Sequence, residues 1–235
     1  MTRFLEHIAS EILLSCPDNL EKQCIVFPNR RAGLFFVKYL SSKAGKPVWS
    51  PAVKTINELF GYCSRLKIAE NETLVFELYK AWQELVKKPE SFDTFYFWGE
   101  MLINDFDDID KYLADAQRLF SNLSELKKID EEFGGLEKEQ IEIVKEFWIN
   151  FNAGEETAEK QDFIKIWNLL PELYVKFRHN LYEKGIAYEG MIFREVAEKC
   201  MEGNLPEMPW ETFHFTGFNA LNKCEKVLMD YLQRS

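Results

Sequence analysis

Two kinds of hydrophobic pattern alternate in the first part of the chain. Apolar residues at helical spacing between Phe4 and Leu13 predict an amphipathic helix that ends near Cys16. Residues 24–27 are continuously apolar, β-branched and aromatic, and Pro28 ends the run. A run of this kind is typical of a strand that is buried on both faces.

The next segment repeats this order of helix and strand. Asn29 can cap a helix over Arg30 to Lys43, and Gly45-Lys46-Pro47 ends this helix before a second strand, predicted over Val48 to Val53. Helix, strand, helix and strand in this order indicate a parallel α/β unit.

From Thr55 to about Gly203 the pattern is almost wholly helical. Thr55 is a good N-cap for a helix through Phe60, and four longer helical patterns follow. They are marked by Leu74, Leu78, Trp82 and Leu85; by Phe92, Phe95, Trp98 and Leu102; by Ile141, Val144, Phe147, Trp148 and Phe151; and by Ile164, Trp167, Leu170, Tyr174, Phe177 and Leu181. Breaks are expected near Lys88-Pro89, Gly134-Gly135 and Asn152-Ala153-Gly154. Pro171 should kink or split the fourth pattern.

The strand signal returns near the C-terminus. Residues 213–217 predict a strand, and Leu221 to Leu232 predict a closing helix. The sequence therefore predicts an α/β fold in which residues 1–65 and 208–235 form the sheet layer. Residues 66–207 form an inserted, all-helical domain in this interpretation.

The charge of the chain is unevenly distributed. The 235 residues carry a formal net charge of −10, and the segment from Glu90 to Glu146, with 16 acidic and 6 basic residues, accounts for the whole excess. Met1 to Arg65 contains nine basic and five acidic residues, so a polyanion would prefer this end. The longest apolar run is far too short to span a membrane, and the start of the sequence lacks a secretory signal pattern. The five cysteines are widely spaced and form no CxxC pair. We therefore expect a cytoplasmic protein with free thiols and no contact with a membrane.

Motifs for nucleotide hydrolysis are missing. A Walker A loop needs glycines before a Lys and then Ser or Thr. In this chain Gly45-Lys46 is followed by Pro47, and Leu40 stands where the first glycine would fall. No acidic pair follows the predicted strand at Phe215, and the three histidines lack partners at the spacing of metal ligands. We expect no catalytic residue, no cofactor and no ATP hydrolysis.

Asp105, Asp107, Asp108 and Asp110 form an acidic cluster with the chemistry to hold a hard cation. Their spacing does not fit an EF-hand loop, because the sixth position is Asp110 rather than Gly and the twelfth is Ala116 rather than Glu. We interpret the cluster as structural, with Asp107 as the N-cap of a helix. A divergent metal enzyme that uses these carboxylates is the weaker alternative.

Arg30 and Arg31 are the basic residues that stand out, directly after Asn29, with Lys38 further along the same helix. A helix N-terminus behind a core strand exposes N–H groups and a partial positive charge, and two guanidinium groups there suit a phosphate. The alternative is a solvated helix face on which Arg31 pairs with a carboxylate.

Four segments carry a resemblance to a known family. They are Cys24-Ile-Val-Phe-Pro-Asn-Arg-Arg-Ala-Gly-Leu-Phe-Phe, Val53-Lys-Thr-Ile-Asn-Glu-Leu-Phe, Phe97-Trp-Gly-Glu-Met-Leu-Ile-Asn-Asp-Phe-Asp-Asp-Ile-Asp-Lys-Tyr-Leu and Phe215-Thr-Gly-Phe-Asn-Ala-Leu-Asn-Lys-Cys-Glu. Together they resemble the N-terminal part of an AddB-like (RexB-like) helicase/exonuclease subunit. The version that they resemble occurs in Bacteroides-type bacteria and is classed as a PD-(D/E)XK nuclease family protein.

This resemblance implies a partial P-loop-NTPase-like parallel sheet core of the superfamily-1 helicase type, with an inserted helical domain, in a much longer protein whose nuclease lies near its C-terminus. Such proteins work with an AddA-like helicase subunit to resect DNA double-strand breaks for recombinational repair. In that alignment the Arg30-Arg31 helix falls at motif Ia, which contacts single-stranded DNA, and Thr55-Ile56-Asn57 falls in the next DNA-side segment. The family's ATP-binding motif would lie before Phe4, where this chain has nothing comparable, so no activity carries over to it.

The predicted function is therefore a catalytically inactive, helicase-like part of a DNA repair nuclease that acts in DNA engagement or scaffolding. Its expected nucleic-acid-binding residues are Asn29, Arg30, Arg31, Lys38 and Thr55. Its expected partners are single-stranded or duplex-end DNA and the AddA-like subunit. The alternative is a stand-alone protein-interaction module that uses the acidic Glu90 to Glu146 surface. An incomplete sheet would leave an apolar edge exposed, which favours self-association.

Overall fold

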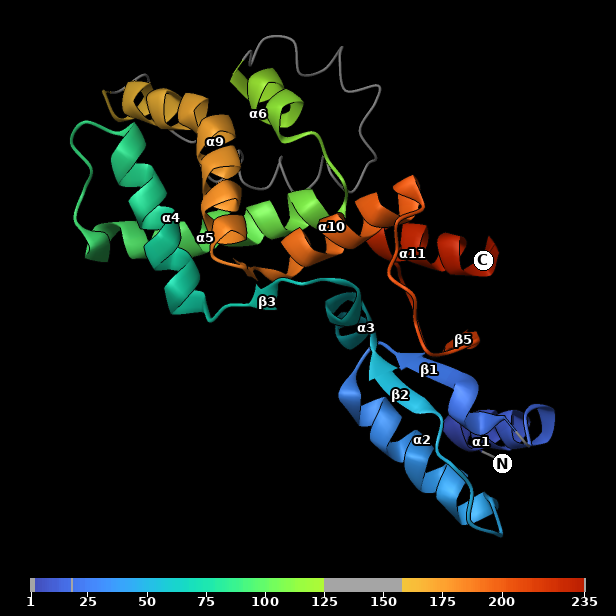
Figure 1. Cartoon of the computed structure of the whole chain (residues 1–235). Helices are drawn as coiled ribbons and strands as arrows, with labels where there is room; N and C mark the ends of the chain where they lie inside the picture. The colour runs from blue at the N-terminus through green and yellow to red at the C-terminus, as the bar shows by residue number, and fades with distance from the viewer. Residues whose placement is uncertain (1–2, 18, 125–157, 235) are drawn as a thin grey trace. The chain divides into compact units, whose positions relative to one another are not determined.

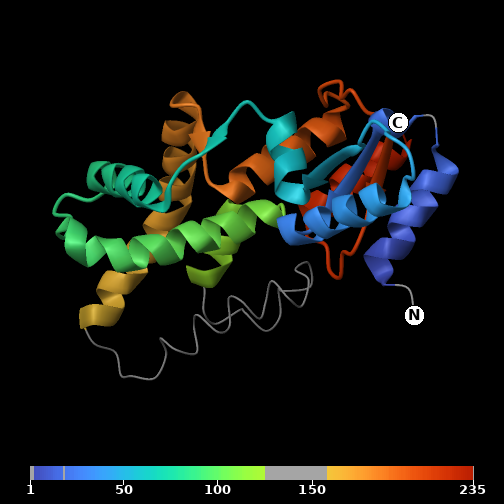
Figure 2. The ribbon, with the colours of Figure 1, turned by 90° about the horizontal axis from the view of Figure 1, so that it is seen from below.

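The chain divides into two compact units. The structure is a computed structural model that describes residues 3–17, 19–124 and 158–234. Unit 1 consists of residues 1–69, 110–113 and 185–235, and unit 2 consists of residues 70–109 and 114–184. Both termini therefore belong to unit 1 (Figure 1, Figure 2). The predicted insertion is longer than unit 2, because residues 185–207 belong to unit 1.

Unit 1 is built on a parallel sheet. Its described strands are β1 (Gln23–Phe27), β2 (Ala52–Thr55) and β5 (Thr212–Phe215), which lie in the order β2-β1-β5 with both pairings parallel. All five residues of the central strand β1 are buried, as expected for a strand that is covered on both faces. The prediction of an α/β fold with a parallel sheet made from both ends of the chain is thereby confirmed.

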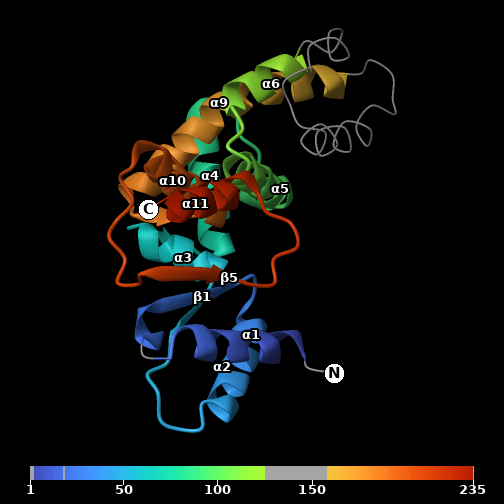
Figure 3. The ribbon, with the colours of Figure 1, turned by 90° about the vertical axis from the view of Figure 1, so that its right-hand side faces the viewer.

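Helices cover both faces of this sheet, as Figure 3 shows. On one face lie α1 (Phe4–Ser15) and α2 (Arg30–Lys43), and Ile25 and Phe27 of β1 share a hydrophobic core with them. On the other face lie α3 (Ile56–Cys63), α10 (Glu189–Glu202) and α11 (Lys223–Arg234). The predicted first, second and closing helices are thus confirmed, each within a few residues of its expected ends.

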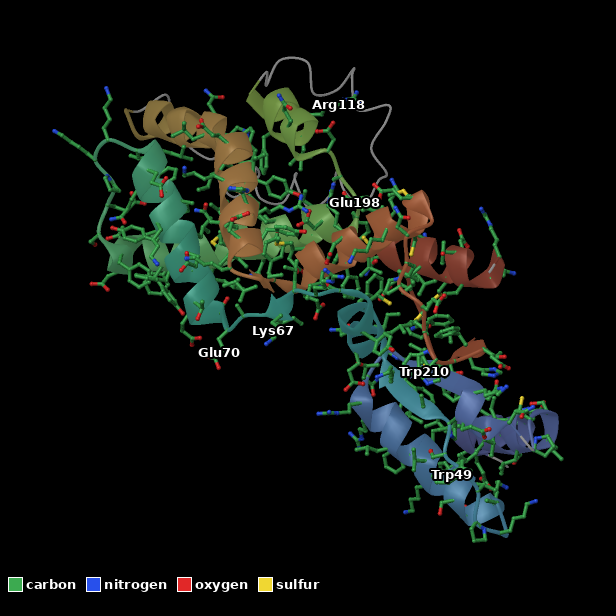
Figure 4. The ribbon with its side chains drawn as sticks, in the orientation of Figure 1. Trp49, Lys67, Glu70, Arg118, Glu198 and Trp210 are labelled. Atoms are coloured by element: carbon green, nitrogen blue, oxygen red, sulfur yellow. The ribbon has the colours of Figure 1, made fainter. Side chains whose placement is uncertain are left out.

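The second strand begins four residues later than the sequence pattern predicts. The pattern favoured a strand over Val48 to Val53, whereas β2 runs from Ala52 to Thr55. Pro47 and Pro51 lack the N–H group that a sheet ladder needs, so pairing starts only after Pro51. The intervening Trp49, labelled in Figure 4, is 82% exposed.

Unit 2 is helical in its described part. It contains α4 (Asn71–Leu85), most of α5 (Phe92–Lys111), α6 (Ala116–Ser124) and α9 (Ala158–Glu183). Aromatic rings fill its core, where Phe106 packs against Tyr174 and Phe177. Pro171 does not split α9, and Figure 1 shows that this helix bends along its length.

One region that the sequence predicted as helical contains two short strands. Strands β3 (Lys67–Ile68) and β4 (Ile186–Ala187) form a short parallel ladder in a region that the pattern predicted as helical. The helix marked by Ile141 to Phe151, and the breaks near residues 134–135 and 152–154, lie outside the described residues. All five cysteines are free thiols, as predicted. None of the described helices is both long and apolar enough to cross a membrane.

Candidate functional site

Four of the five predicted DNA-contacting residues, Asn29, Arg30, Arg31 and Thr55, lie at the carboxyl edge of the parallel sheet in unit 1. Strands β1 and β2 end together there, because Phe27 pairs with Thr55 in their ladder. Each strand leads within a few residues into a helix, so the N-termini of α2 and α3 lie next to each other. In parallel α/β sheets, ligands bind outside the carboxyl ends of the strands.

Side chains cap both of these helix N-termini. Asn29 Oδ1 accepts a hydrogen bond of 3.0 Å from the N–H of Ala32 in α2. Thr55 Oγ1 accepts one from the N–H of Glu58, and the Glu58 carboxylate accepts one from the N–H of Thr55, which completes a capping box. The structure therefore confirms both predicted N-caps. The side-chain oxygens of Asn29 and Thr55 are occupied by hydrogen bonds to backbone N–H groups of α2 and α3.

Arg30 and Arg31 lie in the first turn of α2 and differ in their contacts. A terminal nitrogen of Arg30 lies 3.4 Å from a carboxylate oxygen of Glu58, and the Arg30 side chain is 83% exposed. The Arg31 guanidinium lies 5.9 Å from the centre of the Phe35 ring and forms no ion pair with a described residue. Arg31 is exposed, as the alternative of a solvated helix face expects, but among the described residues the carboxylate pairs with Arg30 rather than with Arg31. An exposed pair of this kind contributes at most about 1 kcal/mol, so a phosphate can compete for Arg30.

Lys38 is not brought together with the other predicted residues. It lies two helical turns beyond Arg31, roughly 10 Å further along the axis of α2. Its neighbours on the helix surface are Leu34 and Phe35, which are also exposed. The carboxyl-edge group therefore consists of Asn29, Arg30, Arg31 and Thr55.

A polar network that the sequence did not predict involves the first turn of α3. Asn57 donates a hydrogen bond to the Glu189 carboxylate, which also accepts one from Lys111 Nζ at 2.6 Å. Lys111 Nζ also lies 5.4 Å from the centre of the Phe193 ring. Glu225 lies close enough to feel the charge of Glu189, and burial together with this charge raises the pKa of Glu225. No local pattern could reveal this network, because its members come from distant parts of the chain. In contrast, the Thr-x-x-Glu spacing from Thr55 was a usable signal for Glu58.

A second unpredicted cluster joins a lysine with two aromatic rings in unit 1. Lys54 Nζ lies 5.6 Å from the centre of the Tyr62 ring and 5.3 Å from the centre of the Trp210 ring. The two ring centres are 5.1 Å apart. Trp210, labelled in Figure 4, precedes β5, whereas Lys54 belongs to β2. These cation–π contacts therefore help to hold the segment before β5 in place.

The acidic cluster in α5 does not begin a helix. All four aspartates lie within α5, so the prediction that Asp107 is an N-cap is wrong: the helix had already begun at Phe92. Asp110 is fully buried, accepts a hydrogen bond from the Tyr188 hydroxyl and pairs with Arg194 Nε at 2.7 Å. No group of three or more metal-binding side chains occurs among the residues that the structure describes.

Comparisons with known proteins add no assignment. No model of a known protein family matches the chain, and no curated protein sequence matches it. The case for a function therefore rests on the residues at the carboxyl edge and on the sequence resemblance.

Proposed function

We propose that this chain is the catalytically inactive, helicase-like N-terminal part of an AddB-like DNA repair nuclease. In this proposal the core is P-loop-NTPase-like, an AddA-like helicase subunit is the partner in recombinational repair, and the carboxyl edge of the sheet engages DNA. The observation that carries the proposal is the pair of capped helix N-termini at this edge, with Arg30 and Arg31 exposed in the first turn of α2. Helix N–H groups and guanidinium groups are both suited to phosphate oxygens.

The same edge contains a residue that limits the affinity for DNA. The Glu58 carboxylate lies 3.4 Å from Arg30 and would repel a phosphate that approaches this arginine. Only a few cationic side chains are available, and the chain carries a net charge of −10. DNA binding by this chain is therefore expected to be weak and sensitive to salt.

Fluorescence anisotropy with a labelled single-stranded oligo(dT) of about 15 nucleotides tests the proposal. We expect a Kd of roughly 10 to 100 μM at low salt, rising steadily as salt is added. Replacing Arg30 and Arg31 together by Ala should remove most of the binding. The melting temperature should change by no more than a few degrees, because exposed arginines contribute little to stability.

Glu58→Gln is the sharper variant, because it should strengthen binding. Gln at this position keeps the capping-box hydrogen bond to the Thr55 N–H and removes the charge beside Arg30. The affinity for oligo(dT) should rise about two- to fivefold. Glu11→Gln, at an exposed glutamate on α1, is the matched control and should leave the affinity unchanged. Undiminished binding by the double arginine variant would show that DNA contacts another face.

The alternative of a protein-interaction module on the Glu90 to Glu146 surface receives less support from the described residues. The Glu90 carboxylate is engaged internally, since it accepts hydrogen bonds from the indole N–H groups of Trp82 and Trp98. Residues 125–146 of that surface lie outside the described part of the chain. This alternative expects no DNA binding at any salt concentration and capture of a basic protein instead.

A further inference from the structure

One side of α2 exposes apolar side chains between exposed cations. Leu34, Phe35 and Val37 are 69%, 39% and 39% exposed, and Arg31 and Lys38 are exposed beside them. Positions 31, 34, 35 and 38 have the spacing that places side chains on one side of a helix, and Val37 adjoins them. These five residues are termed the outer face of α2.

The other sides of α2 contact the sheet and the region of α1 in unit 1. Phe36 and Leu40 are buried in the core that α2 shares with the sheet. The Tyr39 hydroxyl accepts a hydrogen bond from Arg3, the residue before α1, and Lys43 forms an ion pair with Glu6 of α1. The exposed fractions show that the described part of the chain leaves Leu34 largely uncovered and Phe35 and Val37 partly uncovered.

The cations of the outer face are not neutralised by their own helix. The segment from Arg30 to Lys43 contains no acidic residue, and neither Arg31 nor Lys38 forms an ion pair with a described residue. The outer face of α2 is apolar in its middle and cationic at its ends, so it is complementary to a helix with an apolar stripe and acidic flanks.

We propose that the outer face of α2 binds an acidic amphipathic helix of a partner protein. The aliphatic residues decide between a protein and a nucleic acid. Unpaired bases stack on aromatic rings and on arginine, whereas Leu34 and Val37 gain free energy chiefly by burial against other apolar side chains. The proposal goes beyond DNA engagement, because the outer face runs from Arg31 away from the carboxyl edge of the sheet.

Binding of a designed peptide to the whole chain tests this inference. The probe is a fluorescein-labelled peptide of about 18 residues, or five helical turns, with Leu at helical spacing on one side and Glu elsewhere. A peptide of the same composition in permuted order, without an apolar stripe, is the control. Fluorescence anisotropy should show saturable binding of the amphipathic peptide, with a Kd at least about tenfold lower than that of the permuted peptide.

Variants of the outer face separate apolar from electrostatic contributions. Leu34→Ser combined with Phe35→Ser should raise the Kd for the amphipathic peptide about tenfold or more, and Lys38→Glu should raise it severalfold. Leu14→Ser, at a leucine of α1 that is 78% exposed, is the matched control and should leave the Kd unchanged. The Lys38→Glu variant keeps the test decisive if the double serine variant fails to fold, which circular dichroism would show.

The inference and the proposed DNA site can fail separately. Leu34→Ser alone should bind oligo(dT) as the unchanged chain does, because Arg30, Arg31 and the Phe35 ring beside Arg31 remain. Equal binding of both peptides, no binding of either, or an unchanged Kd in the outer-face variants would overturn the inference. Loss of oligo(dT) binding in the Leu34→Ser variant would assign the outer face to nucleic acid instead. Self-association in sedimentation velocity that this variant abolishes would assign the outer face to a second copy of the chain.

Discussion

Asp105 and Asp110 lie in the same helix and have opposite surroundings. Asp110 is fully buried and pairs with Arg194, so its charge is compensated inside the fold. Burial raises the pKa of Asp105 to about 6, and the charge of Asp108 adds to this effect. At the scale of single residues, the fold therefore pairs one carboxylate of the acidic cluster with an arginine, whereas burial disfavours the charged form of Asp105.

Asp105→Asn should remove a pH dependence of stability. The pKa of Asp105 in the folded chain, about 6, lies above its ordinary value of 3.8, so between these values the folded chain keeps a proton that the unfolded chain releases. The free energy of unfolding should therefore fall as the pH rises through this window and stay lower above it. Above pH 6 the variant should be more stable by on the order of 1 kcal/mol, after allowance for solvent screening.

Urea denaturation at several pH values across the window measures this effect. Asp93→Asn, at an exposed aspartate on the same helix, is the matched control and should keep the pH profile of the unchanged chain. An Asp105→Asn profile with the same slope as the unchanged chain would refute the assignment.

Two glycines in helices have different structural roles at the scale of elements. A Cβ atom on Gly33 would lie 2.9 Å from Cγ1 of Val53, so α2 can approach β2 this closely only with glycine at this position. A Cβ atom on Gly61 in α3 would meet no heavy atom within 4 Å. Gly33 is therefore needed for packing, whereas Gly61 only adds flexibility to its helix.

Gly33→Ala and Gly61→Ala should change stability in opposite directions. Gly33→Ala should lower the free energy of unfolding by about 1–3 kcal/mol, because α2 or Val53 must shift. Gly61→Ala should raise it by up to about 1 kcal/mol through helix propensity. Combining Gly33→Ala with Val53→Ala should cost less than the sum of the single changes, because the truncated side chain makes room for the new methyl group. Urea denaturation of the four variants measures these terms, and an additive double variant would contradict the proposed contact.

The sheet of unit 1 joins segments from opposite ends of the chain. Strand β1 pairs with β5, so residues 23–26 lie beside residues 212–215. Strands β3 and β4 likewise pair, although about half of the chain separates them in sequence. At the scale of the whole molecule, the fold thus depends on contacts between distant segments, which must close large loops before they contribute to stability.

The whole chain should bind neither nucleotide nor divalent metal in a saturable manner. Its sequence has no phosphate-binding glycine loop, and Asp110 of the acidic cluster is already paired with Arg194. Millimolar ATP with Mg²⁺ should leave the melting temperature unchanged, as should Ca²⁺ or Mn²⁺ once ionic strength is matched. A saturable site in titration calorimetry would reverse the structural interpretation of the cluster.

The sequence by itself determined the features that depend on near neighbours. The caps at Asn29 and Thr55 were predictable, because each cap bonds an N–H group three residues later along the chain. The buried strand over residues 24–27 was predictable, because a continuous apolar run cannot leave one face in water. The pattern of apolar residues placed the start of β2 too early, because it did not take into account that Pro51 cannot donate to the sheet ladder.

Only the tertiary structure decided which distant side chains meet. It placed Glu58 beside Arg30 and buried Asp110 against Arg194. It also assigned residues 185–207 to unit 1 rather than to the helical unit. The physical reason is that such contacts depend on how whole elements pack, and the spacing of residues along one helix or strand carries no information about its partner.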